Sequence, residues 1–366
     1  MNSPKPVILA AGGTGGHIFP AQALAEELAE RGAPAYLVTD KRFSGYVTEV
    51  PVEETLFIKA GRMEMGLFGK LKGVAMVSVG VLQAIRHLRQ LQPGVVVGFG
   101  GYPAFPTMVA AMLLGIPTII HEQNAVLGRA NRKLLNKVTA VATSFKQTYM
   151  IDEKNQSKVT VTGNPVRASV RALAHLPYRD IAQDGTINIL VIGGSQGASI
   201  FSQIVPAAIA SLPAALRERI RIDQQCRASD LEVTKEVYHQ LGVSANLASF
   251  FSDISTLLAS AHLVITRAGA SSLTELAVAG RPAILVPLPT AMDNHQTINA
   301  NAFEDAGAGW VMTQDGFTAA ALSARIETFM NVPQTMTEAA QAAKSTGNIH
   351  AAEHLADLVQ TIATKD

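Results

Sequence analysis

Two glycine-rich turns of similar design, each directly after an apolar strand, constrain the fold of this chain most. The first follows Val7–Ala11 and reads Gly12-Gly13-Thr14-Gly15-Gly16-His17; the second follows Ile189–Ile192 and reads Gly193-Gly194-Ser195-Gln196-Gly197. A strand, a glycine turn and a helix start together form an anion site, because the ligand can approach the backbone and the first helical N–H groups point at it. Two such turns predict two similar α/β domains that face each other and bind phosphate-bearing ligands.

Short apolar runs alternate with helical periods along the 366 residues, a length that indicates two domains. Continuous Val, Ile and Leu strands separated by helices are typical of buried parallel sheets, so we predict two Rossmann-like halves. The strands are expected at 7–11, 35–38, 95–98, 118–121, 140–143, 160–162, 187–192, 219–224, 263–266, 283–286 and 310–312.

Turn chemistry at Gly163-Asn164-Pro165 predicts the domain boundary. The first domain is then expected over 1–164 and the second over 165–345. A last helix, within 350–366, is expected to pack back on the first domain.

Charge is unevenly divided between the two predicted domains. Residues 1–164 hold 17 Lys and Arg against 11 Asp and Glu, whereas the remaining residues hold 13 against 18. The basic half suits an anionic partner. Hydrophobic residues make up 48% and charged residues 16%, which argues against a disordered chain.

Cysteine content and hydropathy bear on the location of the protein. Cys226 is the single cysteine, so an intrachain disulfide is impossible and a reducing compartment is expected. No secretory signal pattern opens the chain, because Lys5 precedes only a short apolar strand that ends in glycines. The nearest approach to a membrane span, Phe105 to Ile120, is broken by two prolines and a glycine and falls short of roughly 18–20 residues. We therefore expect a cytoplasmic protein.

The first turn departs from the common nucleotide-binding motifs but carries a histidine. Gly12–Gly16 does not match G-x-G-x-x-G, and the chain has no P-loop sequence. His17 stands at the helix entrance, at the strand end where ligands of open α/β sheets bind. A neutral imidazole there can take a proton from a hydroxyl, and the helix N-terminus would keep it neutral. The alternative is a capping or structural histidine.

The stretch Ile265 to Ala277 is the most specific in the chain. A strand ends in a glycine turn, and Gly269-Ala270-Ser271-Ser272 opens a helix with small residues, which lets a diphosphate sit on the N–H groups. Glu275 lies about one and a half turns into this helix, where a carboxylate can accept both hydroxyls of a ribose. Pro287 ends the next strand, and the loop after it leads to Gln296 and Asn299.

These residues resemble the donor site of GT-B nucleotide-sugar glycosyltransferases. Five further motifs stand in the order found in one family, the bacterial UDP-N-acetylglucosamine:lipid I N-acetylglucosaminyltransferases (MurG) of peptidoglycan synthesis. They are Gly12 to His17, Gly98-Phe99-Gly100-Gly101-Tyr102-Pro103, His121-Glu122-Gln123-Asn124, Gly163 to Arg167, and Gly193 to Ala198. The resemblance covers nearly the whole chain and implies a GT-B fold of two Rossmann-like domains across a cleft.

The resemblance also implies roles for individual residues. His17 is the candidate base, and Glu122 is a lesser candidate, with the alternative that it orients a neighbour or a sugar hydroxyl. Contacts to the donor are implied for Thr14, Gly15, Gly16, Asn124, Arg167, Ser195, Phe251, Gly269, Ala270, Ser271, Ser272, Glu275, Gln296 and Asn299. Contacts to the acceptor diphosphate are implied for Gly13, Gly100, Gly101 and Tyr102.

Two positions depart from the family pattern. The family often has Gln-Gln where this chain has His295-Gln296, so the role of position 295 is open. Relatives can carry tryptophans on a membrane-facing patch, whereas Trp310 is the only tryptophan here.

Residues 62–91 bear on membrane contact. A helix from about Lys70 is expected to bury a stripe of Leu71, Val74, Ala75, Leu82, Ile85 and Leu88 in the core. Apolar residues ringed by Lys and Arg suit an anionic membrane surface. This membrane patch is predicted to comprise Met63, Met65, Leu67, Phe68, Lys70, Lys72, Met76, Val79 and Arg86, with a simply buried helix as the alternative.

The family resemblance implies an inverting transferase that moves N-acetylglucosamine from UDP to the 4-hydroxyl of the muramyl sugar of lipid I, giving lipid II. It implies roles in cell-wall biogenesis, cell shape and cell division, at the cytoplasmic face of the plasma membrane, with cell-wall synthesis proteins as further partners and no nucleic acid. No metal and no cofactor are expected, because no cluster of carboxylates appears in the sequence. Three alternatives are a GT-B enzyme with another acceptor, a UDP-N-acetylglucosamine 2-epimerase, and a non-catalytic nucleotide-sugar binding protein.

Overall fold

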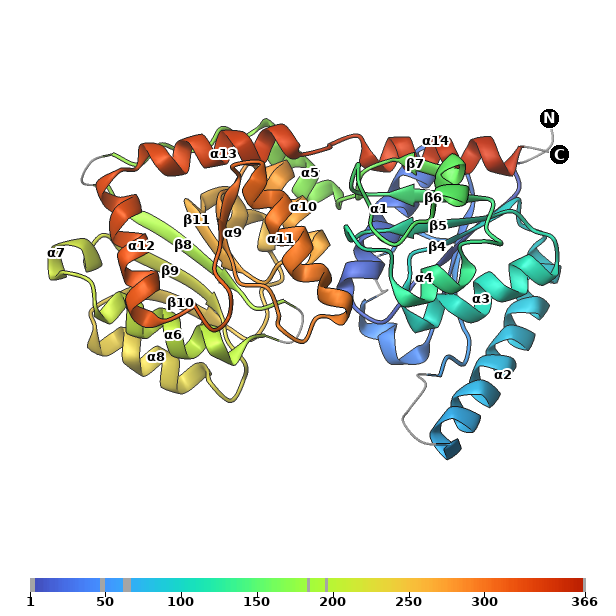
Figure 1. The fold of residues 1–366 in the computed structure, drawn as a ribbon, viewed down its shortest axis with the longest axis horizontal. Coiled ribbons are helices and arrows are strands. Elements are labelled where there is room, and N and C mark those ends of the chain that lie inside the picture. The colour runs from blue at the N-terminus through green and yellow to red at the C-terminus, as the bar shows by residue number, and fades with distance from the viewer. Residues whose placement is uncertain (1–3, 47–49, 62–66, 183–184, 195–196, 365–366) are drawn as a thin grey trace. The chain divides into compact units, whose positions relative to one another are not determined.

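The computed structural model describes residues 4–46, 50–61, 67–182, 185–194 and 197–364. The chain divides into two compact units, an N-terminal unit of Met1–Ala168 with Ile349–Asp366 and a C-terminal unit of Ser169–Asn348. The segment that carries Gly163-Asn164-Pro165, where the sequence indicates a boundary, ends the first stretch of the N-terminal unit. Each unit is a parallel sheet with helices on both faces (Figure 1).

The described part of the N-terminal unit contains a seven-stranded parallel sheet in the order β3-β2-β1-β4-β5-β6-β7. Its strands are β1 (Val7–Ala10), β2 (Ala35–Thr39), β3 (Glu54–Phe57), β4 (Val95–Gly98), β5 (Thr118–Glu122), β6 (Ala140–Thr143) and β7 (Val159–Val161). The helices are α1 (Gly15–Glu30), α2 (Leu67–Leu91), α3 (Gly101–Leu113), α4 (Arg129–Leu134) and α14 (Ala351–Ala363), with 3₁₀ turns η1 (Lys41–Tyr46) and η2 (Glu153–Lys158).

Strand β1 shows why this sheet is covered on both faces. All four of its residues are buried, and they alternate between two cores. Val7 and Leu9 pack with α1 and α14 on one face, whereas Ile8 packs with α2 and α3 on the other. The C-terminal helix α14 therefore completes the N-terminal unit, and Arg31 at the end of α1 donates to Asp357 at 2.6 Å.

The C-terminal unit has a six-stranded parallel sheet within its described residues, in the order β10-β9-β8-β11-β12-β13. Its strands are β8 (Ile187–Ile192), β9 (Ile220–Gln225), β10 (Ser244–Ala248), β11 (Leu263–Thr266), β12 (Ala283–Leu285) and β13 (Gly309–Val311). Its longer helices are α6 (Ser199–Ala210), α8 (Leu231–Gln240), α10 (Ala270–Ala279), α11 (His295–Asp305), α12 (Ala319–Asn331) and α13 (Gln334–Thr346).

Short helices fill the remaining connections of this unit. They are α5 (Ala168–Arg171), η3 (Ala172–His175), α7 (Ala214–Arg217), α9 (Ile254–Ser260) and η4 (Met292–Asn294). One face of the sheet packs against α6 and α12, and the other packs against α9, α10 and α11.

Two strands that the sequence did not predict, β3 and β10, lie at the outer edges of their sheets. Each is only partly buried, because an edge strand has one neighbour and leaves side chains in solvent. The sequence therefore lacks the continuous apolar run that marks the central strands.

Candidate functional site

Three neighbouring strands of the N-terminal unit, β1, β4 and β5, end together and present the predicted motifs at one edge of the sheet. Ala10 pairs with Gly98, so the turns after β1 and β4 start side by side. A Cβ built on Gly101 would lie 2.5 Å from the carbonyl oxygen of Gly12, which no side chain tolerates. Gly101 also has φ of 73°, so glycine is required twice over. The helix starts of α1 and α3 are thereby brought together.

The first glycine turn delivers His17 to the start of α1. Thr14 is the exposed N-cap residue, and its carbonyl oxygen accepts from the backbone N–H of His17 at 3.1 Å. Gly13, Gly16 and His17 are half-buried around the positive end of the α1 dipole. A Cβ on Gly100 would lie 3.3 Å from Cε1 of His17, so the imidazole lies against the turn after β4.

His17 is hydrogen-bonded to residues at the end of β5. Its Nδ1 lies 3.1 Å from Oε1 of Gln123. Nε2 of Gln123 in turn lies 3.0 Å from Nδ1 of His121, whose Nε2 lies 3.2 Å from the carbonyl oxygen of Gly163. His121 is fully buried, and the loss of hydration lowers its pKa to about 4, which keeps it neutral.

Glu122 anchors a loop through both of its carboxylate oxygens. Its side chain is 2% exposed. Oε1 accepts from the backbone N–H and the side-chain amide of Asn124, at 3.1 and 3.0 Å. Oε2 accepts from the backbone N–H of Gly128 and from Nδ2 of Asn131, both at 2.8 Å. The four hydrogen bonds hold Asn124 in place, which agrees with the interpretation that Glu122 orients a neighbouring residue.

Arg42 is a cation near the turn after β4 that sequence reasoning missed. Its guanidinium lies 5.2 Å from the ring centroid of Tyr102, and it donates to both carboxylate oxygens of Asp40 at 2.8 Å. These bonds lower the pKa of Asp40. The side chain of Arg42 is 52% exposed. Only the fold brings η1 beside the start of α3, so the sequence offers no local signal for this contact.

Arg167 lies in the N-terminal unit, just before the boundary. Its guanidinium stacks on the ring of Phe19 at 4.2 Å, and the next residue, Ala168, donates its backbone N–H to Glu26. The segment that leaves this unit is thus fixed on α1.

The C-terminal unit repeats the arrangement of strand, turn and helix twice. After β8, Gly194 and Gly197 adopt φ of 82° and 65°, and α6 follows. Ser195, the predicted phosphate contact of this turn, lies outside the described residues. After β11, Gly269 is the N-cap of α10.

Helix α10 separates its packing face from its predicted binding face. Leu273, Leu276 and Ala277 are buried in the core, as is Ala270 at the helix start. The predicted donor contacts Ser271, Ser272 and Glu275 are half-buried on the other face. Small residues thus surround the N-terminus of α10, as predicted from the sequence.

Two predicted donor contacts hold loops in the structure. Asn299 has no exposed surface, and its Nδ2 donates to the carbonyl oxygen of Ala268 at 3.3 Å. This side chain supports the turn before α10, and its assignment as a direct donor contact stays a prediction. Gln296 is half-buried, and its Oε1 accepts from the backbone N–H of Leu288 at 2.9 Å. The neighbouring His295 bonds through Nδ1 to the carbonyl oxygen of Met292 at 2.7 Å.

Phe251, a predicted donor contact, is half-buried in the loop between β10 and α9. Asp253 ends this loop as the N-cap of α9 and accepts from the backbone N–H of Thr256 at 3.1 Å. Hydrogen bonds from Thr256 and Ser255 lower the pKa of Asp253 to about 2. These hydrogen bonds attach the end of the β10–α9 loop to the first turn of α9.

Arg267, which follows β11 directly, fixes the strand ends next to α10. It donates to the carbonyl oxygens of Val286 and Pro287 and to Oε1 of Gln314, the last at 2.8 Å. Burial lowers the pKa of its guanidinium. A charged residue directly after an apolar strand is the signal that marks it in the sequence.

The predicted buried stripe of α2 is wrong for Val74, Ala75 and Leu82, whereas Leu88 is buried as predicted. Val74 is 55% exposed and Leu82 is 68% exposed, and Ala75 is exposed as well. The core contacts are made by Gly73, Gly80, Ala84 and Leu88. The reason is close backbone approach, since a Cβ on Gly80 would lie 2.0 Å from the carbonyl oxygen of Lys59.

The predicted membrane patch is only partly described. Met63 and Met65 lie outside the described residues, and the side chains of Leu67, Phe68, Lys70 and Lys72 are not described. Val79 and Arg86 are exposed on α2, and Met76 is half-buried. From Gly73 to the end of α2, the exposed apolar residues are Val74, Ala75, Val79 and Leu82.

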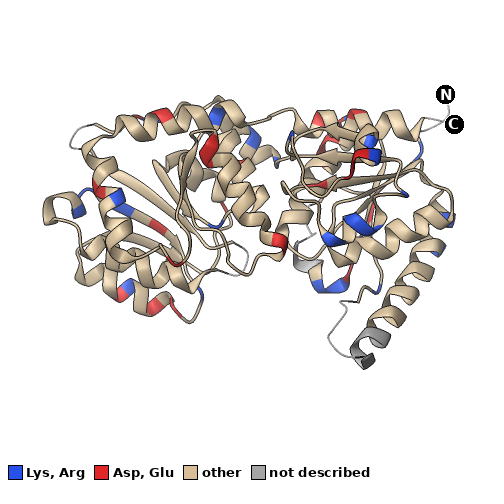
Figure 2. Cartoon of the chain, viewed as in Figure 1, with Lys and Arg blue, Asp and Glu red and all other residues tan. Residues whose placement is uncertain are grey.

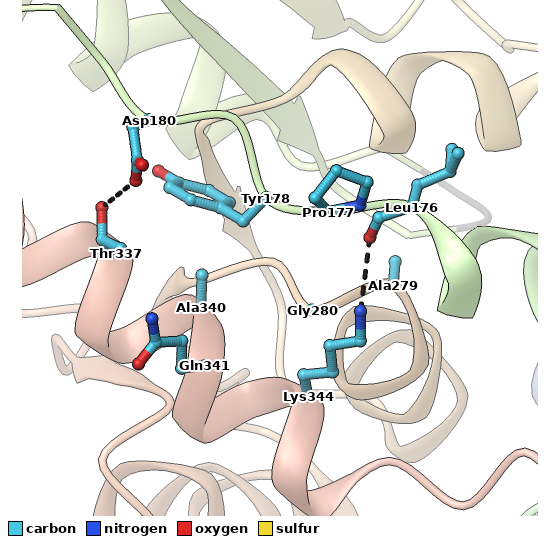
Figure 3. Close-up of a pocket in the computed structure, with 10 residues that line it drawn as sticks. All are labelled: Leu176, Pro177, Tyr178, Asp180, Ala279, Gly280, Thr337, Ala340, Gln341 and Lys344. Carbon is cyan, nitrogen blue, oxygen red and sulfur yellow. Dashed lines mark hydrogen bonds between the residues drawn. The ribbon is translucent and has the colours of Figure 1, made fainter.

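A cavity of about 240 Å³ lies elsewhere in the C-terminal unit (Figure 3). It is bounded by Leu176, Tyr178 and Asp180 on one side and by the end of α10 and α13 on the other. The predicted donor residues lie at the opposite end of α10, so this cavity is not the donor site. Among the described residues, no group of three His, Cys, Asp or Glu side chains could hold a metal ion. No described helix has the length and apolar character to cross a membrane.

Both units match known protein families. The N-terminal domain of glycosyltransferase family 28 matches residues 7–143, and the C-terminal domain of that family matches residues 188–361. A Paramagnetospirillum magneticum protein named UDP-N-acetylglucosamine–N-acetylmuramyl-(pentapeptide) pyrophosphoryl-undecaprenol N-acetylglucosamine transferase is 50% identical over 98% of this chain and 97% of its own length. A Rhodospirillum centenum protein of the same name is 50% identical over 98% and 94%.

Solved structures agree with the sequence matches. The crystal structure of Acinetobacter baumannii MurG superposes with a TM-score of 0.78 at 32% identity, covering 98% of this chain and all of that one. The glycosyltransferase of kitacinnamycin gives a TM-score of 0.71 at 17% identity, which shows the fold alone.

Proposed function

The chain belongs to glycosyltransferase family 28, and we infer that it transfers N-acetylglucosamine from UDP to N-acetylmuramyl-(pentapeptide) pyrophosphoryl-undecaprenol. The observation that supports this function is the 50% sequence identity with the Paramagnetospirillum magneticum transferase, which extends across both units. Its two parallel-sheet units form a GT-B fold. The enzyme is thus an N-acetylglucosaminyltransferase that makes lipid II for peptidoglycan.

His17 is the proposed base of the transfer. The 4-hydroxyl of the muramyl sugar attacks the anomeric carbon, and its proton passes to the imidazole. The bond from that carbon to the UDP oxygen breaks with inversion, and UDP leaves with the electron pair. The position of His17 at the start of α1, beside two glycine turns, supports this role.

Donor binding is proposed to depend on α10 and its neighbours. The diphosphate would lie on the N-terminus at Gly269–Ser272, where the helix dipole and backbone N–H groups favour negative charge. Glu275 would accept the ribose hydroxyls, and Arg167 and Ser195 would contact phosphate. Asn124, held by Glu122, and Gln296 would contact the sugar. Gly100, Gly101 and Tyr102 would hold the acceptor diphosphate.

Transfer is proposed to need no metal or cofactor, because helix N-termini and arginine can stabilise the leaving diphosphate. Activity should persist in excess EDTA when the assay contains no metal-dependent coupling enzyme. Complete loss that magnesium restores would contradict this proposal.

The exposed apolar stripe of α2 is proposed to contact an anionic membrane surface from the cytoplasm. Val74, Val79 and Leu82 share one helix face, and no charged residue occurs from Gly73 to Ile85 (Figure 2). Arg86 and Arg89 lie nearby for anionic headgroups. Binding of other cell-wall synthesis proteins stays a prediction, and no nucleic-acid partner is proposed.

Vesicle sedimentation tests the membrane proposal. The protein should bind vesicles rich in anionic lipid, and rising salt should weaken binding. The double variant Val79→Asp/Leu82→Asp should bind less and keep its UDP affinity. Val233→Asp serves as the control, because Val233 is 70% exposed on α8 of the other unit. Equal binding to neutral and anionic vesicles would exclude an electrostatic contact.

Incubation with labelled UDP-N-acetylglucosamine, with and without lipid I, tests the transfer itself. Label should move to the lipid only when lipid I is present. A product that stays on UDP with an altered sugar would indicate an epimerase. Binding without any product would indicate a nucleotide-sugar binding protein, and transfer to a different acceptor would identify another GT-B enzyme.

A further inference from the structure

Backbone carbonyl groups determine the position of every proton in the chain of contacts that ends at His17. A carbonyl oxygen can only accept a hydrogen bond. Nε2 of His121 lies 3.2 Å from the carbonyl oxygen of Gly163, so this nitrogen must carry the ring proton. In a neutral imidazole the other nitrogen, Nδ1, is then an acceptor.

The amide of Gln123 is oriented by the same rule. Its Nε2 lies 2.9 Å from the carbonyl oxygen of Phe99 and 3.0 Å from Nδ1 of His121. Both neighbours accept, so the amide nitrogen must face them. The backbone carbonyl oxygen of His121 also accepts from Nε2 of Gln123, at 3.2 Å. The side-chain oxygen of Gln123 is thereby directed to His17.

Oε1 of Gln123 can only accept, and it lies 3.1 Å from Nδ1 of His17. We propose that Gln123 is a positioning residue that holds His17 as the Nδ1–H tautomer, and that buried His121 fixes the amide of Gln123. This tautomer leaves Nε2 of His17 unprotonated, which is the form that a base requires. The inference deepens the proposed function and rests on the assignment of His17 as base.

Burial makes this chain of contacts rigid. His121 has no exposed surface and Gln123 is 2% exposed, so water does not compete for their hydrogen bonds. The depressed pKa of His121 keeps its Nδ1 an acceptor throughout the neutral range. Cβ atoms on Gly100 or Gly101 would lie 3.3 or 3.2 Å from the ring of His17, so the turn after β4 limits the rotation of the imidazole.

The tautomer can be measured without any substrate. Long-range ¹H–¹⁵N correlation in ¹⁵N-histidine-labelled enzyme, assigned with His17→Gln, should show His17 protonated at Nδ1 and not at Nε2. Gln123→Met removes the acceptor with little change in shape, and the proton should move to Nε2. An Nε2–H tautomer in the unaltered enzyme would overturn the proposal, as would Gln123→Met with an unchanged spectrum.

Kinetics give the second measurement. Gln123→Met should lower kcat about 10²-fold or more, with unchanged UDP affinity, since holding a catalytic histidine in the wrong tautomer is costly. Gln123→Glu, as the buried protonated acid, can donate its O–H to the carbonyl oxygen of Phe99 and accept from Nδ1 of His17, so it should keep the tautomer and a kcat within about tenfold. A kcat for Gln123→Met equal to that of the unaltered enzyme would refute the positioning role.

The matched control is Gln224→Met. Gln224 is a buried glutamine of the other unit that accepts from the hydroxyl of Tyr238 at 2.7 Å. It should lose comparable stability and change neither the His17 spectrum nor kcat. If His17→Ala keeps full activity, the assignment of His17 as base fails, whereas the spectra still decide whether Gln123 sets the tautomer.

Discussion

Glu122 of the N-terminal unit and Arg281 of the C-terminal unit are buried charged side chains, and they are held by hydrogen bonds in opposite ways. Glu122 of the N-terminal unit is 2% exposed and accepts four N–H bonds, from Asn124, Gly128 and Asn131. Arg281 of the C-terminal unit is 1% exposed and donates to three backbone carbonyl groups.

Helix dipoles favour both arrangements. Gly128 is the N-cap of α4, so the carboxylate of Glu122 lies at the positive end of a helix. The acceptors of Arg281 include Leu258 and Ala259 in the last turn of α9, the negative end. Burial lowers the pKa of Arg281, but three acceptors keep the guanidinium satisfied.

Glu122 and Arg281 lie at opposite edges of their parallel sheets. Glu122 is the last residue of β5, at the carboxyl edge where ligands of parallel sheets bind. Arg281 precedes β12, at the amino edge of its sheet. Substitutions at the first edge should therefore change catalysis, and substitutions at the second should change stability.

The largest effect is expected at the carboxyl edge of the N-terminal unit. His17→Ala should lower kcat by about 10²–10⁴-fold, because the attacking hydroxyl loses its base. UDP affinity and Tm should change little, and His239→Ala on the exposed face of α8 should be neutral. If only the KM for the lipid acceptor rises, His17 positions the diphosphate, and a bound water becomes the better candidate for the base.

Arg281→Met tests the opposite edge. It should lower the free energy of unfolding by about 3 kcal/mol or more, because three carbonyl groups lose a charged donor. Urea unfolding measures this loss, and UDP affinity of the folded fraction should stay unchanged. Arg217→Met is the control, since Arg217 also donates to a backbone carbonyl, but at the surface. A loss below about 1 kcal/mol would show that the buried guanidinium is easily replaced.

The central strands were predictable from sequence because burial on both faces requires continuous apolar runs. The prediction failed for β3 and β10, whose edge positions leave their side chains mostly exposed or only partly buried. It also failed for the face of α2. Apolar periodicity favours Val74 and Leu82 as core residues, but Gly73 and Gly80 make the close contact.

The glycine turns predicted the starts of the two helices that carry His17 and Glu275, because the signal is local in the sequence. The partners that orient these residues are distant in the chain. Gln123 is more than 100 positions from His17, and Arg42 meets Tyr102 only through the fold. Asn299 carried a binding motif, yet only the packing of α11 shows that it is buried.

The buried His121 predicts a stability effect at the carboxyl edge that depends on pH. Its pKa is about 4 in the folded protein and about 6.5 when unfolded. Above pH 6.5 both states are neutral and the contribution is complete. As pH falls from 6.5 to 4, only the unfolded state binds the proton, so stability is lost, by about 1.4 kcal/mol per pH unit at most.

Urea unfolding at pH 7.5 and pH 5 measures this dependence. His121→Gln should reduce the loss between the two pH values, whereas His239→Gln, at an exposed position, should not. An equal loss in all three proteins would assign the pH dependence to other groups and leave His121 with a purely geometric role.

Glu275→Ala should have little effect on stability, because Glu275 lies half-buried on the face of α10 that does not pack in the core. Loss of the ribose hydrogen bonds should weaken UDP binding by about 1.5–3 kcal/mol, the range for a charged acceptor. Calorimetric titration with UDP measures this, and Tm should stay within a few degrees of the original. Glu236→Ala, on exposed α8, is the matched control. Unchanged UDP affinity would remove Glu275 from the donor site, and a large fall in Tm with little change in affinity would make α10 resemble the amino edge, where Arg281 stabilises the fold.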